Sequence, residues 1–266
     1  MTDQSPFRMR FRAGEVAVNM PVRSTLMNEI RKRLINGRGF ALATVNLDHL
    51  VKLRNGGAFR RAYDAQDFVV ADGNPIVWLS RLARKPVELI PGSDLVLPLT
   101  RIAAEEGATV ALIGANDDTL QAAATRLRAE TPELNIVYQR APSYGFDPEG
   151  AEADEILADL AASGAQLALI ALGAPKQEIF AARGRAKAPK VGFASIGASL
   201  DFLAGSQKRA PFWVRKLALE WVWRMAGNPR RLMGRYLQCA MILPSLALGA
   251  LGPAEAADAG PGGEAA

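Results

Sequence analysis

A carboxylate stands directly after a short apolar run in the first third of the chain. Asp72 follows residues 68–71, Phe-Val-Val-Ala, and precedes Gly73. At the carboxyl end of a buried strand, such a carboxylate can reach into a crevice and act as a general base. It could equally cap a helix that begins near Pro75, because Asp is a favourable N-cap residue. The spacing alone leaves both interpretations open.

Two further polar side chains end another apolar run. Thr44 and Asn46 are two positions apart, so in a strand they point the same way and could hydrogen-bond a sugar or a base. A polar strand end with a helix cap explains them as well, and the residues alone favour that interpretation. His49, three residues further on, is expected to pack in the interior or to lie on the surface.

A Gly-Ser turn opens one of the expected helices. Pro91-Gly92-Ser93-Asp94 could hold a phosphate or a sugar hydroxyl with its backbone N–H groups. The alternative is that Ser93 caps the helix and Asp94 complements the helix dipole. This alternative is slightly favoured.

A second glycine turn is more specific. In Leu172-Gly173-Ala174-Pro175-Lys176-Gln177-Glu178, an apolar run ends at Gly173 and Pro175 lies near the first helical position. Lys176 and Gln177 would project at the helix start, where they could meet a phosphate or a sugar, or simply be solvated. The turn lacks the Gly-x-x-x-x-Gly-Lys-Ser/Thr spacing of a P-loop.

The composition argues against several kinds of site. Cys239 is the single cysteine and His49 the single histidine, so neither an internal disulfide nor a site dominated by Cys or His ligands can form. Asn116-Asp117-Asp118 could hold a divalent metal on a nucleotide diphosphate, but a helix cap is the favoured interpretation. No Gly-x-Gly-x-x-Gly follows a strand, which weighs against a dinucleotide oxidoreductase.

Short apolar runs alternate with helical patterns, which predicts βαβ units and a mostly parallel sheet. Its ligand would lie beyond the carboxyl ends of the strands, where Gly114, Gly173 and Gly197 allow close backbone approach. The expected strands cover residues 40–45, 68–71, 109–114, 136–139, 167–172 and 191–196. The expected helices cover residues 22–36, 47–63, 75–84, 93–106, 119–130, 151–162 and 176–186.

The segment after this pattern is basic and aromatic. Between residues 208 and 235 it has eight basic side chains and one acid, with tryptophans interleaved. Arg224, Arg231 and Arg235 would share one helix face, although Pro229 is expected to break the helix. A solvated basic helix is the usual meaning of such a run. Large aromatics beside arginines instead fit an interface with lipid headgroups or a partner protein.

The end of the chain suggests a place at a membrane surface. The apolar run at residues 237–251 is shorter than the ~20 residues needed to cross a bilayer. Residues 1–12 lack the apolar region of a signal peptide. We therefore expect a cytoplasmic protein that lies on the inner membrane surface, and the net charge of +5 is modest over the whole chain. Residues 252–266 are Ala, Gly, Pro and acids, and are expected to be disordered.

Several motifs occur together in an order that closely resembles the WecG/TagA/CpsF family of bacterial glycosyltransferases, over roughly residues 16–236. Linked motifs in order are far more specific than any one of them. The motifs are Thr44-x-Asn46, Ala71-Asp72-Gly73, Pro91-Gly92-Ser93-Asp94-Leu95, Leu172 to Glu178, Asp201-Phe202-Leu203-Ala204-Gly205, Arg209-Ala210-Pro211, Leu219-Glu220-Trp221 and Pro229-Arg230-Arg231.

The resemblance implies an α/β catalytic core in residues 1–206, with a Rossmann-like, mostly parallel sheet flanked by helices, the architecture called GT-E. Residues 207–251 would form a helical, basic, membrane-associating appendage that completes the active site, ahead of the disordered tail. The implied activity is inverting and independent of metals and cofactors. It moves N-acetylmannosamine or a related hexose from a UDP-sugar to an undecaprenyl-diphosphate-linked saccharide in cell-surface polysaccharide biosynthesis.

The resemblance also assigns roles to residues. The family's proposed base matches Asp72, and the C-terminal arginines match residues that close over the site. Ser199-Leu200 departs from the family pattern, which usually has an aromatic there, and Val45 stands where Pro is common. The expected substrate-binding residues are Thr44, Asn46, Gly73, Gly92, Ser93, Asp94, Gly114, Gly173, Lys176, Gln177, Glu178, Gly197, Asp201, Arg209, Arg224, Arg230, Arg231 and Arg235.

The expected partners are a UDP-sugar donor, a polyprenyl-diphosphate-linked acceptor and the inner face of the bacterial plasma membrane. No nucleic acid is expected, and a second copy of the chain could cover the apolar C-terminal run. Two alternatives remain open. One is a nucleotide-binding, Rossmann-like oxidoreductase, and the other is a basic adaptor for membranes or nucleic acid, although its aromatics would lie on a helix and not on a β platform.

Overall fold

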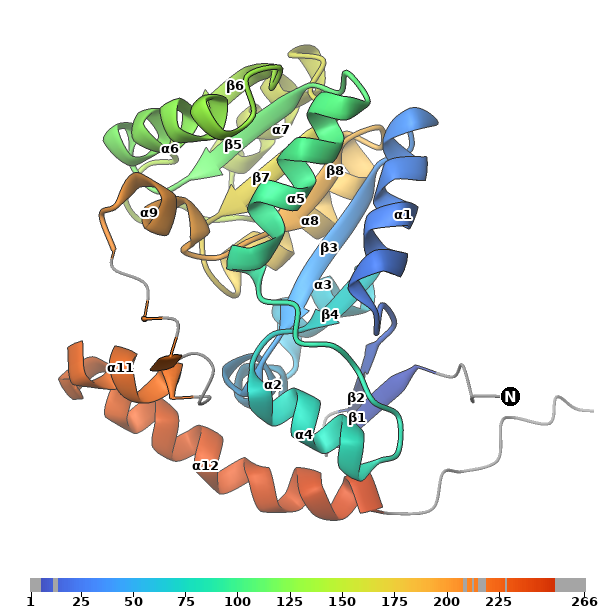
Figure 1. The fold of residues 1–266 in the computed structure, drawn as a ribbon, viewed down its shortest axis with the longest axis vertical. Helices are drawn as coiled ribbons and strands as arrows, with labels where there is room; N and C mark the ends of the chain where they lie inside the picture. The colour runs from blue at the N-terminus through green and yellow to red at the C-terminus, as the bar shows by residue number, and fades with distance from the viewer. Residues whose placement is uncertain are drawn as a thin grey trace, which may run out of the picture.

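The computed structural model describes residues 6–11, 14–207, 210–211, 213–214, 219–227 and 229–251. A sheet of six strands forms its centre, with helices on both faces and a long C-terminal helix crossing one end (Figure 1). Every neighbouring pair in this sheet is parallel. The strand order is β4 (Phe68–Ala71), β3 (Phe40–Val45), β8 (Gly192–Ser195), β7 (Leu167–Ala171), β5 (Val110–Gly114) and β6 (Ile136–Arg140).

The six strands are those that the apolar runs predict, and the α/β class with a parallel sheet is confirmed. Five strands are buried along their whole length, while the edge strand β6 is not. This is the pattern of a parallel sheet covered on both faces. Continuous apolar runs therefore identified the strands.

Helices cover the two faces of the sheet unequally. One hydrophobic cluster joins α1 (Arg23–Ile35), α5 (Gly92–Glu105) and α6 (Asp117–Glu130) to one face. A second cluster joins α7 (Ala151–Ala162) and α8 (Lys176–Lys187) to the other face. Figure 1 shows α5 and α1 in front of the sheet and α8 behind it. The sheet is thus buried between two layers of helices.

One helix expected from the sequence is two helices in the structure, so the prediction of a single helix is wrong. Residues 47–63 form two helices, α2 (Leu47–Leu53) and α3 (Gly57–Asp64). Gly56, the N-cap of α3, and Gly57, its first residue, have φ angles of +68° and +77°, a conformation that glycine adopts without steric cost. The first helix ends at Leu53, and the glycine pair then turns the chain into the second.

An N-terminal hairpin was not predicted. Strands β1 (Phe7–Phe11) and β2 (Gly14–Val18) pair antiparallel. Their side chains alternate, so that Phe7, Met9, Val16 and Val18 are buried. This face joins a third cluster with α2, α4 (Asn74–Leu82) and the C-terminal helix. The hairpin thus supplies part of the surface on which the end of the chain rests.

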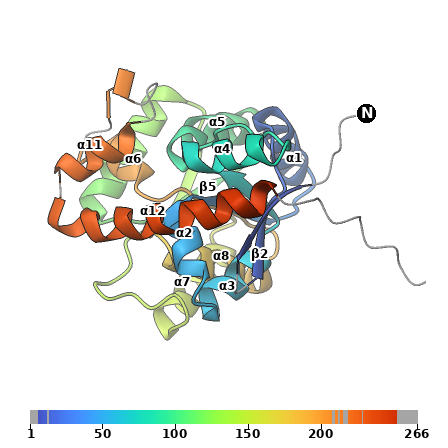
Figure 2. The ribbon, with the colours of Figure 1, turned by 90° about the horizontal axis from the view of Figure 1, so that it is seen from below.

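The C-terminal region contains α9 (Ser199–Ala204), α11 (Glu220–Gly227) and α12 (Pro229–Leu251). The helix break expected at Pro229 is present, because α12 begins at that residue. Figure 2 shows α12 running across α2 and towards the β1–β2 hairpin. Its buried side chains are Cys239, Ile242 and Leu246. Among the described residues, no helix is long and apolar enough to span a membrane.

Candidate functional site

The carboxyl edge of the sheet brings several predicted turns together. Gly92, at the start of α5, lies against the end of β8, where an added Cβ would come within 3.0 Å of the Ile196 carbonyl oxygen. Gly114 at the end of β5 is placed more tightly, since its Cβ would lie 2.4 Å from the Ala171 carbonyl oxygen. Glycine is therefore required at Gly114, while a side chain at Gly92 would press against the backbone at Ile196. Gly73, Gly173 and Gly197 lie in the turns after β4, β7 and β8.

Asp72 and Asn46 face each other across this edge. Asn46 Nδ2 donates to Asp72 Oδ2 at 3.2 Å, and the Asp72 backbone N–H donates to the Val45 carbonyl oxygen at 2.8 Å. The alternative that Asp72 caps the next helix is wrong, because Gly73 is the N-cap of α4 and no side chain caps that helix. The carboxylate is thus held at a strand end by Asn46, and Gly73 takes the N-cap position of the helix.

Asn46 has two functions in the structure. Its Oδ1 accepts from the His49 backbone N–H at 3.1 Å and so caps α2, as one interpretation of the sequence expected. Its amide N–H donates to Asp72 at the same time. Because the cap fixes the amide oxygen, the amide nitrogen is fixed towards the carboxylate. One side chain therefore both starts a helix and orients Asp72.

A buried aromatic pair supports the strand end at Thr44. The Thr44 carbonyl oxygen accepts from Tyr63 Oη at 2.6 Å and lies 2.7 Å from His49 Nδ1. A carbonyl can only accept, so His49 carries its proton on Nδ1. Burial lowers the pKa of His49 to about 4, so the imidazole is neutral at neutral pH. His49 is therefore a packing residue, as one of the two expectations held, and the Thr44 side chain is also buried.

The turn after β7 is tied to the turn after β8. Gln177 Oε1 accepts from the Gly197 backbone N–H at 3.0 Å, and Gln177 Nε2 donates to Glu178 Oε1 at 2.8 Å. Gln177 and Glu178 are 2% and 0% exposed, whereas Lys176 is half-buried. Burial raises the pKa of Glu178 to about 7. The helix start is therefore not simply solvated.

The start of α5 does not have the Ser93 cap that the sequence favoured. Pro91 is the N-cap, and no side chain caps the helix, so a Ser93 cap is wrong. Asp94 lies in the first turn, where its carbonyl oxygen accepts from Arg23 Nη1 at 3.3 Å. The N-cap residue of this helix, a proline, therefore offers no side chain to the first backbone N–H groups.

Two further candidate positions, Asp201 and Asn116, have structural partners. Asp201 lies in α9, and its Oδ1 accepts from Ser206 Oγ at 3.3 Å in the turn that follows. Asn116 caps α6 by accepting from the Thr119 N–H at 2.8 Å, so the cap interpretation of Asn116-Asp117-Asp118 is correct. In the described part of the chain, no group of three or more His, Cys, Asp or Glu could hold a metal ion.

The C-terminal helix reaches the site through α2. Arg235 Nε lies 3.5 Å from Asp48 Oδ1, and Lys52 Nζ lies 2.9 Å from Asp48 Oδ2. Lys52 Nζ also donates to the Ala174 carbonyl oxygen at 3.1 Å, in the turn after β7. Asp48 and Lys52 were not predicted as site residues from the sequence. Their spacing of four residues in a helix was the available signal, because it places the two side chains side by side.

The structure describes the other predicted arginines only in part. Arg230 lies exposed near the start of α12. Arg224 lies in α11 and Arg231 in α12, but their side chains are outside the described residues, as is all of Arg209. Their roles stay predictions.

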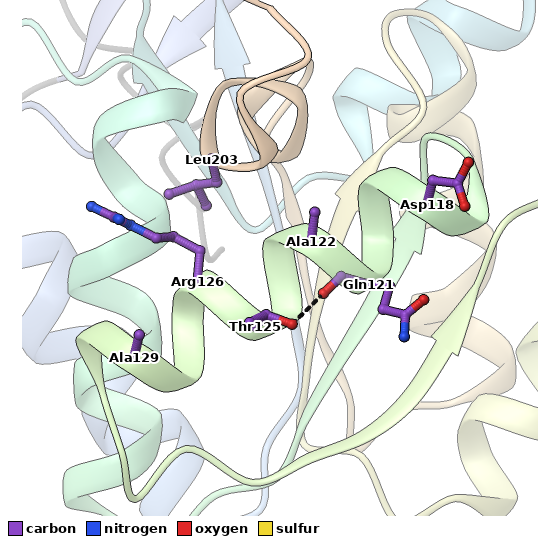
Figure 3. A pocket seen from close by; sticks show the side chains of 7 residues that line it. All are labelled: Asp118, Gln121, Ala122, Thr125, Arg126, Ala129 and Leu203. Atoms are coloured by element: carbon purple, nitrogen blue, oxygen red, sulfur yellow. Dashed lines mark hydrogen bonds between the residues drawn. The ribbon is translucent and has the colours of Figure 1, made fainter.

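A groove of roughly 670 Å³ lies elsewhere, along α6 and α9 (Figure 3). Leu203 of α9 borders it on one side, and Gln121, Thr125 and Arg126 of α6 on the other. Arg126 is paired with Glu130 at 3.0 Å. Asp118, from the Asn116-Asp117-Asp118 segment, lines this groove, whereas Asp72, Asn46 and Gln177 do not.

A comparison with protein families gives an independent result. Residues 12–253 match the family described as "Glycosyl transferase WecG/TagA/CpsF family". The match covers the sheet, its carboxyl edge and all of the C-terminal helices. It agrees with the resemblance that the motifs carry.

Proposed function

The chain belongs to the WecG/TagA/CpsF family of glycosyl transferases, and from this premise we propose that it is an inverting hexosyltransferase. Its donor is a UDP-sugar, with N-acetylmannosamine or a related hexose as the sugar. Its acceptor is an undecaprenyl-diphosphate-linked saccharide in cell-surface polysaccharide biosynthesis. The observation that carries the proposal is the Asp72 carboxylate, held by Asn46 at the carboxyl edge of the sheet.

Asp72 is the general base of this reaction. It takes the proton of the acceptor hydroxyl as the oxygen attacks the anomeric carbon of the donor. The new bond forms on the face opposite UDP, the bond from the anomeric carbon to the diphosphate oxygen breaks, and UDP leaves with its electron pair. An α-linked donor therefore gives a β-linked product. A positioned base contributes about 10²- to 10⁴-fold to such a step.

Backbone and basic groups around the edge fit the leaving diphosphate. The starts of α5 and α8 lie at this edge, and helix N-termini attract anions. Lys176 stands at the first position of α8. Arg209, Arg224, Arg230 and Arg231 are proposed to add positive charge as the diphosphate departs. In this proposal the protein groups carry the charge that a metal ion carries in other transferases.

One face of α12 supports docking on the inner face of the plasma membrane. Met233, Leu237, Met241, Leu248 and Leu251 recur at helical spacing and are 61–71% exposed. They lie opposite the buried Cys239, Ile242 and Leu246. An apolar stripe of this kind binds a bilayer surface by burying its side chains among the acyl chains. Trp221 and Trp223 of α11 are exposed as well and suit the headgroup level.

The appendage of residues 207–251 is proposed as a functional unit that rests on the core. Ile242 and Leu246 share a hydrophobic cluster with Phe7 and Met9 of the N-terminal hairpin. Its removal would uncover those side chains. Point substitutions on the exposed stripe are therefore a cleaner test of its role than truncation after Ser206.

A screen for UDP release tests the proposal. Each candidate UDP-sugar is incubated with the protein and a polyprenyl-diphosphate-linked saccharide, and UDP is measured with and without the acceptor. Acceptor-dependent release from one donor supports the proposal. Binding of NAD(P)H without UDP release would favour the oxidoreductase, and salt-dependent binding of RNA or DNA without UDP release would favour the adaptor.

A further inference from the structure

The Glu178 carboxylate is buried, and its contacts in the fold do not offset the free-energy cost of that burial. It lies in the first turn of α8 with no solvent exposure, and its Oε2 has no hydrogen-bond partner among the described residues. A buried ionised carboxylate is unfavourable unless it is well paired. An apolar side chain at this position would avoid that cost. Stability alone therefore does not account for a glutamate here.

The other oxygen of Glu178 fixes the orientation of Gln177. Glu178 Oε1 accepts from Gln177 Nε2 at 2.8 Å, while Gln177 Oε1 accepts from the Gly197 N–H at 3.0 Å. If the amide flipped, its NH₂ group would face the Gly197 N–H and its oxygen would face the carboxylate. Both contacts would then be repulsive. The amide is consequently locked from both ends.

The two hydrogen bonds of the Gln177 side chain, with Gly197 and with Glu178, form a lock that joins two turns at the carboxyl edge of the sheet. Gln177 belongs to the turn between β7 and α8, and Gly197 to the turn between β8 and α9. The strands β7 and β8 are neighbours in the middle of the sheet. The hydrogen bond from Gly197 therefore sets how far apart the two turns stand at the carboxyl edge.

We propose that Glu178 is a positioning residue that holds Gln177, and through it the turns at Gly173 and Gly197, in the arrangement that receives the nucleoside diphosphate of the donor. Glu178 itself does not touch the ligand. This inference rests on the proposed function. It changes the expected role of Glu178 from a binding residue to a support of the neighbouring Gln177.

Two substitutions of nearly equal size separate positioning from stability. In E178Q the side-chain carbonyl can still accept from Gln177 Nε2, so UDP affinity by calorimetry should stay within about twofold of the wild type. In E178M the acceptor is lost, so UDP should bind about tenfold more weakly, the effect of one lost hydrogen bond. At pH 8 the thermal midpoint of E178M should not fall, because removal of a buried charge offsets the unpaired amide.

Gln66 offers a matched control. Gln66 Nε2 donates to the Glu178 backbone carbonyl oxygen at 3.3 Å, so Q66M removes a bond to the same residue outside the lock. Q66M should leave UDP affinity unchanged. Wild-type affinity in E178M, or equal losses in Q66M and E178M, would overturn the inference. Loss of folding in E178M would overturn it too, since an undiminished thermal midpoint is predicted.

Hydrogen exchange at the Gly197 amide gives a readout that needs no ligand. Its N–H is bonded to Gln177 Oε1, so protection should fall in E178M and persist in E178Q. If the wild type binds no UDP but this pattern is found, the lock stands and the proposed donor is wrong. Unchanged protection in E178M would contradict the lock whatever the donor is.

Discussion

The Asn46 side chain donates to Asp72 Oδ2 at 3.2 Å while its own oxygen accepts from the His49 N–H at 3.1 Å. The first contact orients the proposed base, and the second starts α2. The base is thus positioned by the same residue that anchors a helix. This relationship makes Asn46 a sensitive place to test the account.

Substitution N46D should lower turnover and leave the fold intact. Asp caps a helix as well as Asn does, but a second carboxylate beside Asp72 raises the pKa of one of the pair and repels the anionic donor. We expect turnover to fall by about tenfold or more, measured as UDP release. N116D is the matched control, because Asn116 caps α6 in the same way and follows β5, which is three positions away from β3 in the sheet. Equal effects of N46D and N116D would contradict this role of Asn46.

The apolar stripe on α12 should bind anionic vesicles. M241E/L248E places two charges on the stripe, whereas Q238E/S245E places two charges at the same spacing on exposed positions beside it. Anionic lipid headgroups repel both variants equally, so the difference in their vesicle affinity measures the contact between the apolar stripe and the lipid. In co-sedimentation, the stripe variant should bind at least about tenfold more weakly than its control. Equal binding of the two variants would mean that the stripe faces something other than lipid.

Protonation of His49 should destabilise the fold in mild acid. Its pKa is lowered, chiefly by burial, to about 4 in the folded state, against about 6.5 in an unfolded chain. Between these values the unfolded chain binds a proton that the folded chain does not, so stability is complete above pH 6.5 and falls as the pH falls. The loss between pH 7.5 and 4.5 is about 2.5 kcal/mol.

Urea unfolding of the wild type and of H49Q at the two pH values measures this effect. The wild type should lose about 2.5 kcal/mol more than H49Q over that range, because glutamine does not titrate. Other acids titrate in both proteins and cancel in the difference. Parallel losses in the two proteins would show that His49 is protonated without cost.

The sequence was sufficient for the central sheet and for the grouping of Thr44, Asn46 and Asp72. Fully buried parallel strands are continuous apolar runs, and parallel strands bring their carboxyl ends to one edge. The N-terminal hairpin was missed, although the alternation of Phe7 and Met9 with polar residues was its signal. Short alternating segments at a chain end are weak evidence without knowledge of what covers them.

The packing of polar side chains could not be read from the sequence. Lys176 and Gln177 were both expected to project at the helix start, yet Gln177 is buried whereas Lys176 is half-buried. Arg235 was expected to bind substrate, and in the structure it is paired with Asp48 of α2. Burial and pairing of this kind depend on segments far away in the chain. Local spacing does not encode them.

The most direct test of the account is the turnover of D72N. With the donor found in the screen and the lipid-linked acceptor, the rate of UDP release should fall by about 10²- to 10⁴-fold, while the dissociation constant for UDP stays close to that of the wild type. D64N is the control, because Asp64 lies exposed on α3 and pairs with Arg60; it should turn over normally. Near-normal turnover of D72N would contradict the assignment of Asp72 as the base.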